Sequence, residues 1–183
     1  MIITITGKPC SGKGTVSKIF CKKFNFEYLC TGDMFRELAK QNGYDNILDF
    51  QNNQDVSKFD FIIDDKIKKI GKTRKADNLV IDSRLAWHFT EQSFKVFIDV
   101  SWKEAAKRLH KDQRETEKTT DEKHAESVLK NRWQTENDRY TKLYNTNNLD
   151  PANYDFVISS DNKTPEEIAD KIFEEYKKFV EKI

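Results

Sequence analysis

The sequence predicts an α/β fold in which helices cover both faces of a five-stranded parallel sheet. Short apolar segments alternate with helical patterns along the chain, which is typical of such sheets. One of them, 95–100, is nearly continuous in apolar residues, as expected of a strand with both faces buried. A glycine-rich loop separates the first apolar segment from the first helical pattern. The 183 residues fit a single domain, 1–183, with a core of its own.

The five strands are expected to end at a common edge where ligands bind. The predicted strands are 2–6, 26–29, 78–82, 94–100 and 155–159. In parallel sheets, ligands collect at the carboxyl ends of the strands. Residues with useful chemistry stand at these ends: Gly7 follows the first strand, 31–33 the second and 82–84 the third, and Asp99 lies at the end of the fourth. The sequence therefore predicts the site along this edge.

Two segments interrupt the simple alternation. The first, about 31–74, contains helical patterns with polar breaks at 41–43 and 51–54, and we expect it to cover a substrate. The second, about 112–121, is strongly charged and is either a mobile lid or a solvated linker. Beyond them, Thr164 opens the last helix with a capping box and a proline at the first helical position.

The loop after the first strand has the sequence of a phosphate-binding loop. Residues 7–13 read Gly-Lys-Pro-Cys-Ser-Gly-Lys, and a strand before them and a helix after them turn backbone N–H groups toward one point. Lys13 adds a positive charge for the β- and γ-phosphates. The alternative is a glycine-rich turn with a solvated lysine. We expect ATP to contact Gly7, Lys8, Pro9, Cys10, Ser11, Gly12, Lys13, Gly14 and Thr15.

The residue after Lys13 departs from the general motif. Gly14 stands where a hydroxyl side chain usually holds magnesium, and Thr15, a possible ligand, comes one residue late. The Gly-Lys-Gly-Thr variant resembles nucleoside monophosphate kinases. That resemblance implies magnesium held mostly through water and phosphates.

Composition limits the partners and the compartment. The net charge of +1 argues against a nucleic-acid-binding protein, which usually has a basic excess. The three cysteines lack metal-ligand spacing and favour a reducing compartment. We see no signal peptide and no apolar run of the roughly 20 residues that a membrane helix needs. We expect a soluble, cytoplasmic monomer whose partners are small-molecule nucleotides.

The seven arginines are candidate phosphate ligands, because most basic residues of the chain are lysines. A guanidinium binds phosphate through two parallel hydrogen bonds and stays charged when desolvated. Arg132 and Arg139 are seven residues apart on a predicted helix, 121–144, and share a face. They either contact phosphate or only rim the buried stripe of Trp133 and Tyr140.

Further candidates follow the second strand. Thr31 or Asp33 is a reasonable helix cap, and Arg36 lies about one turn later. A cation there opposes the helix dipole, so an anionic ligand is expected beside Arg36.

Two pairs of residues complete the set. Asp82 and Arg84 close the third strand, where they would hold the water shell of a magnesium ion and an acceptor phosphate, or merely form an internal ion pair. Asp60 and Asp64 lie four residues apart on one helical face. They either accept a hydrogen bond from a base or are solvated acids.

Together these motifs resemble the nucleoside monophosphate kinases, and most closely the compact archaeal-type cytidylate kinases. The resemblance rests on 7–15, 31–36, 82–86 and 139–144 and spans nearly the whole chain. It implies a P-loop NTPase fold with a nucleotide-monophosphate-binding insertion at about 31–74 and a lid at about 112–121. The Asp-Gly-Phe-Pro-Arg segment of adenylate kinases is absent, and Ser83 replaces the glycine expected before Arg84.

The resemblance implies roles for three groups of residues. The expected catalytic residues are Lys13, Arg84, Arg132 and Arg139, and the loop is joined in ATP binding by Arg108 and Arg114. The acceptor is expected to be bound by Thr31, Asp33, Arg36, Asp60, Asp64 and Arg84. The expected reaction moves the γ-phosphoryl group of ATP, with magnesium, to CMP or dCMP. Adenylate-kinase-like or other small-molecule kinase activity is one alternative. A nucleotide-binding regulator without turnover is the second.

Overall fold

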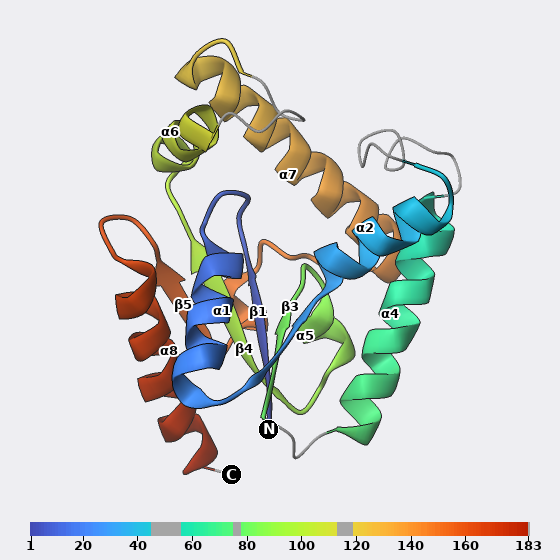
Figure 1. The fold of residues 1–183 in the computed structure, drawn as a ribbon, viewed down its shortest axis with the longest axis vertical. Helices are drawn as coiled ribbons and strands as arrows, with labels where there is room; N and C mark the ends of the chain where they lie inside the picture. The colour runs from blue at the N-terminus through green and yellow to red at the C-terminus, as the bar shows by residue number, and fades with distance from the viewer. Residues whose placement is uncertain (45–55, 75–77, 113–118, 183) are drawn as a thin grey trace.

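The computed structural model describes residues 1–44, 56–74, 78–112 and 119–182, and these form the predicted parallel sheet with helices around it (Figure 1). The five strands lie in the order β2-β3-β1-β4-β5. Neighbouring strands are parallel throughout. The first strand is therefore central, and the loop that follows it opens near the middle of the sheet edge.

The strand boundaries agree closely with the sequence prediction. The strands are β1 (Ile2–Gly7), β2 (Glu27–Cys30), β3 (Leu79–Asp82), β4 (Ser93–Asp99) and β5 (Phe156–Ser159). Every residue of β1 and β3 is buried, as expected of interior strands that are covered on both faces.

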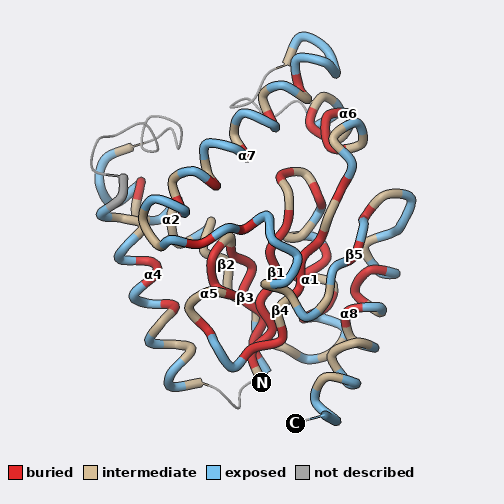
Figure 2. The backbone as a smooth tube through the Cα atoms, turned by 180° about the vertical axis from the view of Figure 1, so that it is seen from behind, coloured by how far each residue is buried: buried red, intermediate tan, exposed pale blue. Residues whose placement is uncertain are grey.

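One face of the sheet is covered by α1 (Lys13–Phe24) and α8 (Pro165–Val180). Phe20 of α1 and Ile172 of α8 are fully buried against Ile3 and Val96 of the sheet. Buried residues gather along the central strands (Figure 2). The predicted start of α8 is confirmed, because Thr164 and Glu167 form a complete capping box.

The opposite face is covered by α4 (Val56–Thr73) and α5 (Ala86–Phe89), and α2 (Thr31–Gln41) packs beside them. Ile63 and Ile67 of α4 are buried against Leu79 and Ile81 of the sheet. Of the two polar breaks predicted in 31–74, the one at 41–43 coincides with the end of α2. The break at 51–54 lies outside the described residues.

A third group of helices crosses the carboxyl edge of the sheet. It consists of α6 (Trp102–Asp112) and α7 (Glu122–Tyr144), which pack together through Leu109 and Leu129 (Figure 1). The short 3-10 helix η1 (Pro151–Asn153) then leads into β5. Only residues 112 and 119–121 of the predicted lid are described.

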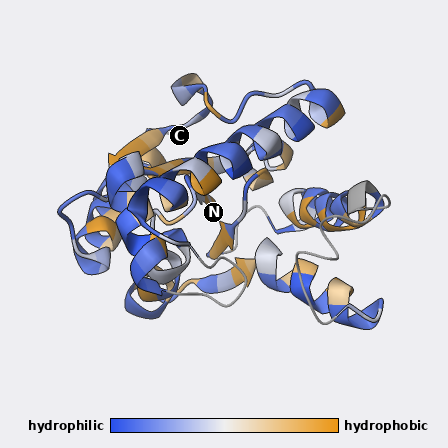
Figure 3. Cartoon of the chain, turned by 90° about the horizontal axis from the view of Figure 1, so that it is seen from above, coloured by the Kyte–Doolittle hydropathy of each residue, from blue (hydrophilic) through white to orange (hydrophobic). Residues whose placement is uncertain are grey.

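Hydrophilic residues predominate along the helices (Figure 3). No helix within the described ranges is long and apolar enough to cross a membrane.

Candidate active site

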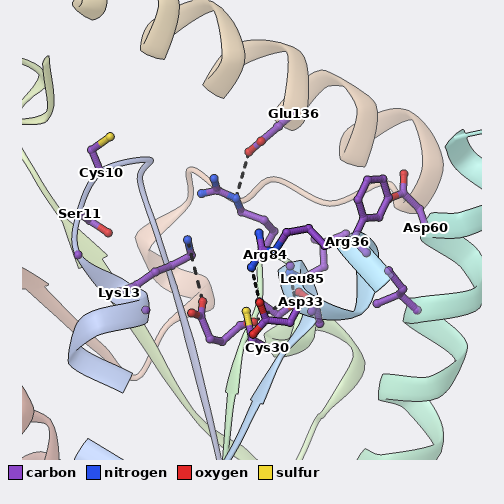
Figure 4. A pocket seen from close by; sticks show the side chains of 18 of the residues that line it. Cys10, Ser11, Lys13, Cys30, Asp33, Arg36, Asp60, Arg84, Leu85 and Glu136 are labelled. Atoms are coloured by element: carbon purple, nitrogen blue, oxygen red, sulfur yellow. Dashed lines mark hydrogen bonds and ion pairs between the residues drawn. The ribbon is translucent and has the colours of Figure 1, made fainter. Parts of the chain in front are cut away.

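A cavity of about 660 Å³ lies where the loop after β1 faces α7 and α2 (Figure 4). It is lined by Cys10, Ser11, Gly12, Lys13, Gly14, Thr15, Lys18, Ile19, Cys30, Thr31, Gly32, Asp33, Phe35, Arg36, Asp60, Ile63, Asp64, Asp82, Ser83, Arg84, Leu85, Arg132, Glu136, Arg139 and Tyr140. Most of the candidates from the sequence, drawn from five elements and their loops, therefore share one cavity.

The loop exposes donors to this cavity. α1 begins at Lys13, so the amides of its first turn have no acceptor within the helix. Ser11 is 1% exposed, and its hydroxyl has no hydrogen-bond partner among the described residues. Gly7 must be glycine because a Cβ there would lie 2.2 Å from the carbonyl oxygen of Ile98. The loop is thus tightly packed underneath and carries unsatisfied donors, as a phosphate site would.

Lys13 extends into the cavity toward the end of β3. Its Nζ lies 4.0 Å from Oδ1 of Asp82, a buried carboxylate with 5% exposure. Burial, followed by the charge of Arg84, lowers the pKa of Lys13 to about 8. A bound polyanion would favour the charged form, so the loop is electrostatically prepared for phosphate.

Glu136 brings a carboxylate into contact with two arginines of the site. Its Oε2 lies 3.1 Å from Nε of Arg84, and its Oε1 lies 3.2 Å from Nε of Arg132 (Figure 4). Arg84 also donates to the carbonyl oxygen of Gly7 at 2.6 Å. Burial alone would raise the pKa of Glu136, but the charges of Arg84 and Arg132 outweigh it and hold that pKa below its usual value.

The acidic pair of α4 faces the C-terminal half of α7. Asp60 forms an ion pair with Arg139 at 3.6 Å, and Asp64 accepts a hydrogen bond from the hydroxyl of Tyr144. Burial raises the pKa of Asp60, and it raises that of Asp64 to about 6 even though the Tyr144 hydrogen bond opposes this. These acids are not solvated surface groups.

The segment after β2 differs from the prediction in one detail. We expected Thr31 or Asp33 to cap α2, but the N-cap is Cys30, and no side chain caps the helix. The hydroxyl of Thr31 instead donates to the carbonyl oxygen of Asp82 at 3.4 Å. Asp33 forms an ion pair with Arg36, so an internal anion already offsets the conflict of Arg36 with the helix dipole.

Several residues predicted to contact ATP do not line the cavity. Lys8 points to Asp99 instead, with its Nζ 2.7 Å from Oδ1, and Gly7 and Pro9 are also absent from the lining. Arg114 lies outside the described residues.

Arg108 does not line the cavity either, although it contacts the loop from outside. Its guanidinium donates to the carbonyl oxygen of Cys10 at 3.1 Å and to the hydroxyl and carbonyl oxygens of Ser160, each at 3.0 Å. In this structure it joins the loop to the end of β5.

Two residues near the cavity were not predicted from the sequence. Glu136 lies between the two arginines that we selected on its helix, four residues after Arg132, and that i,i+4 spacing could have revealed it. Tyr28 donates a hydrogen bond to Asp82 at 3.1 Å. No sequence signal could have revealed Tyr28, because the contact joins residues 54 positions apart.

Within the described ranges, no three His, Cys, Asp or Glu side chains are grouped so that they could hold a metal ion. A cation beside Asp82 would therefore take most of its oxygen ligands from phosphates and water, as magnesium commonly does.

A central parallel strand, a phosphate-binding loop and a helix that opens with Lys13, with arginines arranged opposite them, define a P-loop kinase fold. The family model described as an AAA domain matches residues 3–130. A cytidylate kinase from Sulfurisphaera tokodaii is 32% identical over 98% of this chain and 97% of its own. The chain belongs to the archaeal-type cytidylate kinase family.

Two further similarities extend this picture. An S-adenosylmethionine-dependent nucleotide dehydratase from Lacinutrix mariniflava is 33% identical over 96% of this chain, but this chain spans only 36% of that relative's length. The crystal structure of shikimate kinase from Aquifex aeolicus has a TM-score of 0.59 and 20% identity, covering 97% of this chain and 96% of that one. At this identity the likeness concerns the fold alone.

Proposed function

We propose that the protein transfers the γ-phosphoryl group of ATP to a nucleoside monophosphate, with CMP or dCMP as the preferred acceptor. The proposal rests on the observation that the phosphate loop, two arginines and two acids of α4 line the same cavity. The arginines are Arg84 and Arg132, and the acids are Asp60 and Asp64. Membership in the cytidylate kinase family supports the choice of acceptor.

The donor side of the reaction is assigned to the loop. The amides of the first turn of α1 and the ammonium group of Lys13 would bind the β- and γ-phosphates. The buried hydroxyl of Ser11, which has no partner among the described residues, would donate to a phosphate oxygen. These groups hold the donor in place and spread the charge that develops on the transferred group.

The acceptor side is assigned to α2, α4 and the end of β3. Arg36 and Arg84 would bind the acceptor phosphate, and Arg132 and Arg139 on α7 would reach the phosphoryl group in transfer. Thr31 and Asp33 would line the acceptor pocket, while Asp60 and Asp64 would accept hydrogen bonds from the amino group of the base. An acceptor phosphate oxygen is already ionised, so no protein nucleophile is needed, and catalysis consists of alignment and charge neutralisation.

The residues present fit magnesium. Asp82 is 5% exposed and has few partners among the described residues, namely Tyr28 and, at 4.0 Å, Lys13. Such a carboxylate suits the water shell of a hard cation. Bound with ATP, magnesium neutralises charge on the β- and γ-phosphates. Asp82 would hold its waters, and Thr15, which also lines the cavity, is a further candidate ligand.

The segments that could exclude water are also assigned. We propose that 31–74 is the monophosphate-binding insertion and that 112–121 is the lid. The first borders the cavity, since residues of α2 and α4 line it, and the second precedes α7, whose C-terminal half also lines it. Closure of these walls would keep water away from ATP.

The test is an ADP-release assay with ATP and magnesium against CMP, dCMP, UMP, AMP, GMP and shikimate. Turnover with CMP or dCMP well above the others supports the proposal. Turnover with AMP or shikimate instead would assign the site to another kinase class. ATP binding without turnover on any acceptor would indicate a nucleotide-binding regulator, and Lys13→Ala serves as the control that should abolish both binding and turnover.

A further inference from the structure

We propose that Tyr28 is a positioning residue, whose hydroxyl holds the Asp82 carboxylate for the magnesium complex of ATP in place of the hydroxyl that the phosphate loop lacks at position 14. The inference rests on the proposed function for the identity of the ligand. It assigns a role to a residue that lies beneath the cavity and is not part of its lining.

The contact itself is well supported by the fold. Strands β2 and β3 pair so that Cys30 lies beside Asp82, and Tyr28 is two residues before Cys30 on the same face of β2. The Tyr28 ring packs against the core on the α1 side of the sheet, and its hydroxyl donates to Oδ2 of Asp82 at 3.1 Å. The ring is held by packing, so the hydroxyl is fixed in direction.

Gly14 explains why a tyrosine can reach this carboxylate. A Cβ at position 14 would lie 3.3 Å from Oδ2 of Asp82 and 4.0 Å from the Tyr28 hydroxyl. A serine or threonine at position 14, as in the general motif, would therefore place its side chain in the space beside Oδ2 that Tyr28 serves. Glycine at position 14 therefore leaves room for the Tyr28 hydroxyl beside Oδ2 of Asp82.

The consequence concerns the second oxygen of the carboxylate. With Oδ2 bound by Tyr28, Oδ1 remains directed to Lys13, 4.0 Å away. This leaves Oδ1 available to a water molecule of the cation. Without the Tyr28 hydroxyl, the buried Asp82 would lose its hydrogen-bond donor, and its carboxylate would no longer be held in this orientation. A fixed carboxylate is what an outer-shell ligand of a metal requires.

The experiment compares binding of a non-hydrolysable β,γ-imido ATP analogue by calorimetry, with and without magnesium. Tyr28→Phe keeps the ring and removes the hydroxyl. We expect binding in magnesium to weaken about tenfold, the scale found for outer-shell partners of metal ligands, while magnesium-free binding stays unchanged. Tyr176→Phe is the matched control, since Tyr176 packs against the same core but lies on α8, and both of its affinities should equal those of the wild type.

A substitution at Gly14 provides a second test. Gly14→Ser in the wild type should crowd Asp82 and weaken magnesium-dependent binding. In the Tyr28→Phe background the same serine should occupy the freed space, donate to Asp82 and recover most of the lost affinity. Equal affinities for Tyr28→Phe and wild type, equal losses with and without magnesium, or no recovery in the double variant would each overturn the proposal.

The binding experiment and the ADP-release assay can fail independently of each other. No acceptor is present in the binding experiment. Failure to phosphorylate CMP would therefore contradict the proposed acceptor, but it would not change the ratio of the affinities measured with and without magnesium. If the wild type bound the analogue equally well with and without magnesium, the inference would fall even if CMP were phosphorylated.

Discussion

Glu136 is a buried carboxylate whose charge acts on three cations of the site. It contacts Arg84 and Arg132 directly, and its charge also acts on Lys13. In Glu136→Gln the two arginines and the lysine would lose their internal counter-charge. We expect the free protein to lose about 1–3 kcal/mol of stability, because a buried ion pair would lose one partner.

The measurement is a thermal melt with and without ATP. For a chain of this size each kcal/mol corresponds to roughly 2–4 °C in Tm. ATP should raise the Tm of Glu136→Gln more than that of the wild type, since its phosphates would replace the missing negative charge. A smaller ATP-induced shift in the variant would show that Glu136 assists nucleotide binding and does not stand in for phosphate.

Arg84 is a second residue whose substitution has an expected effect, here on turnover. Its Nη1 already donates to the carbonyl oxygen of Gly7 and its Nε faces Glu136, so the plane of the guanidinium group is fixed near the end of β3. Arg84→Lys preserves the charge but loses the planar, two-point contact with phosphate. We expect kcat/KM for the acceptor to fall by about 10- to 100-fold in steady-state assays, with a folded protein by circular dichroism. Unchanged turnover would contradict its assignment as a phosphate ligand.

At the scale of elements, α4 and α7 meet through Asp64 and Tyr144, and the burial of Asp64 between them makes stability depend on pH. Burial raises the pKa of Asp64 to about 6 in the folded protein, above its ordinary value of 3.8. The folded state therefore binds this proton more tightly than the unfolded chain. The contribution of Asp64 to stability is complete below the unfolded value and is lost as the pH rises through about 6.

The comparison of wild type with Asp64→Asn isolates this contribution. Between pH 4 and pH 7.5 the wild type should lose about 1–3 kcal/mol relative to the variant, whose amide does not titrate. Urea denaturation at several pH values measures the difference. Parallel curves for the two proteins would mean that the buried carboxyl has an ordinary pKa.

Secondary-structure elements were largely predictable, whereas the directions of long side chains were not. Strand positions follow from apolar runs, and the start of α8 follows from its capping box, because both signals are local. Lys8 and Arg108 were expected to contact ATP, but they point to Asp99 and to Ser160, which are remote in sequence. Glu136 was not predicted, because the arginines of its helix were interpreted as phosphate ligands and not as partners of an acid. Sequence therefore predicts the place of the site better than its internal contacts.

At the scale of the whole molecule, the cavity lies between three groups of helices that meet at one edge of the sheet. The proposed donor groups come from α1 and its loop, and the proposed acceptor groups come from α2 and α4. The helix α7 spans the two, with Arg132 near the donor side and Arg139 near Asp60. In the proposed reaction, two polyanions would therefore bind side by side in one volume of about 660 Å³.

This arrangement predicts that one molecule carrying both nucleosides will bind more tightly than either nucleotide alone. Adenosine and cytidine joined by five phosphates would fill both subsites, and the link removes the entropic cost of bringing them together. At a concentration 100 times its Kd, such a ligand adds about 2.7 kcal/mol of stability and raises Tm by roughly 5–10 °C. The control is the diadenosine analogue, which should stabilise less. If the mixed compound raises Tm no more than ATP at equal concentration, the donor and acceptor sites do not share this cavity.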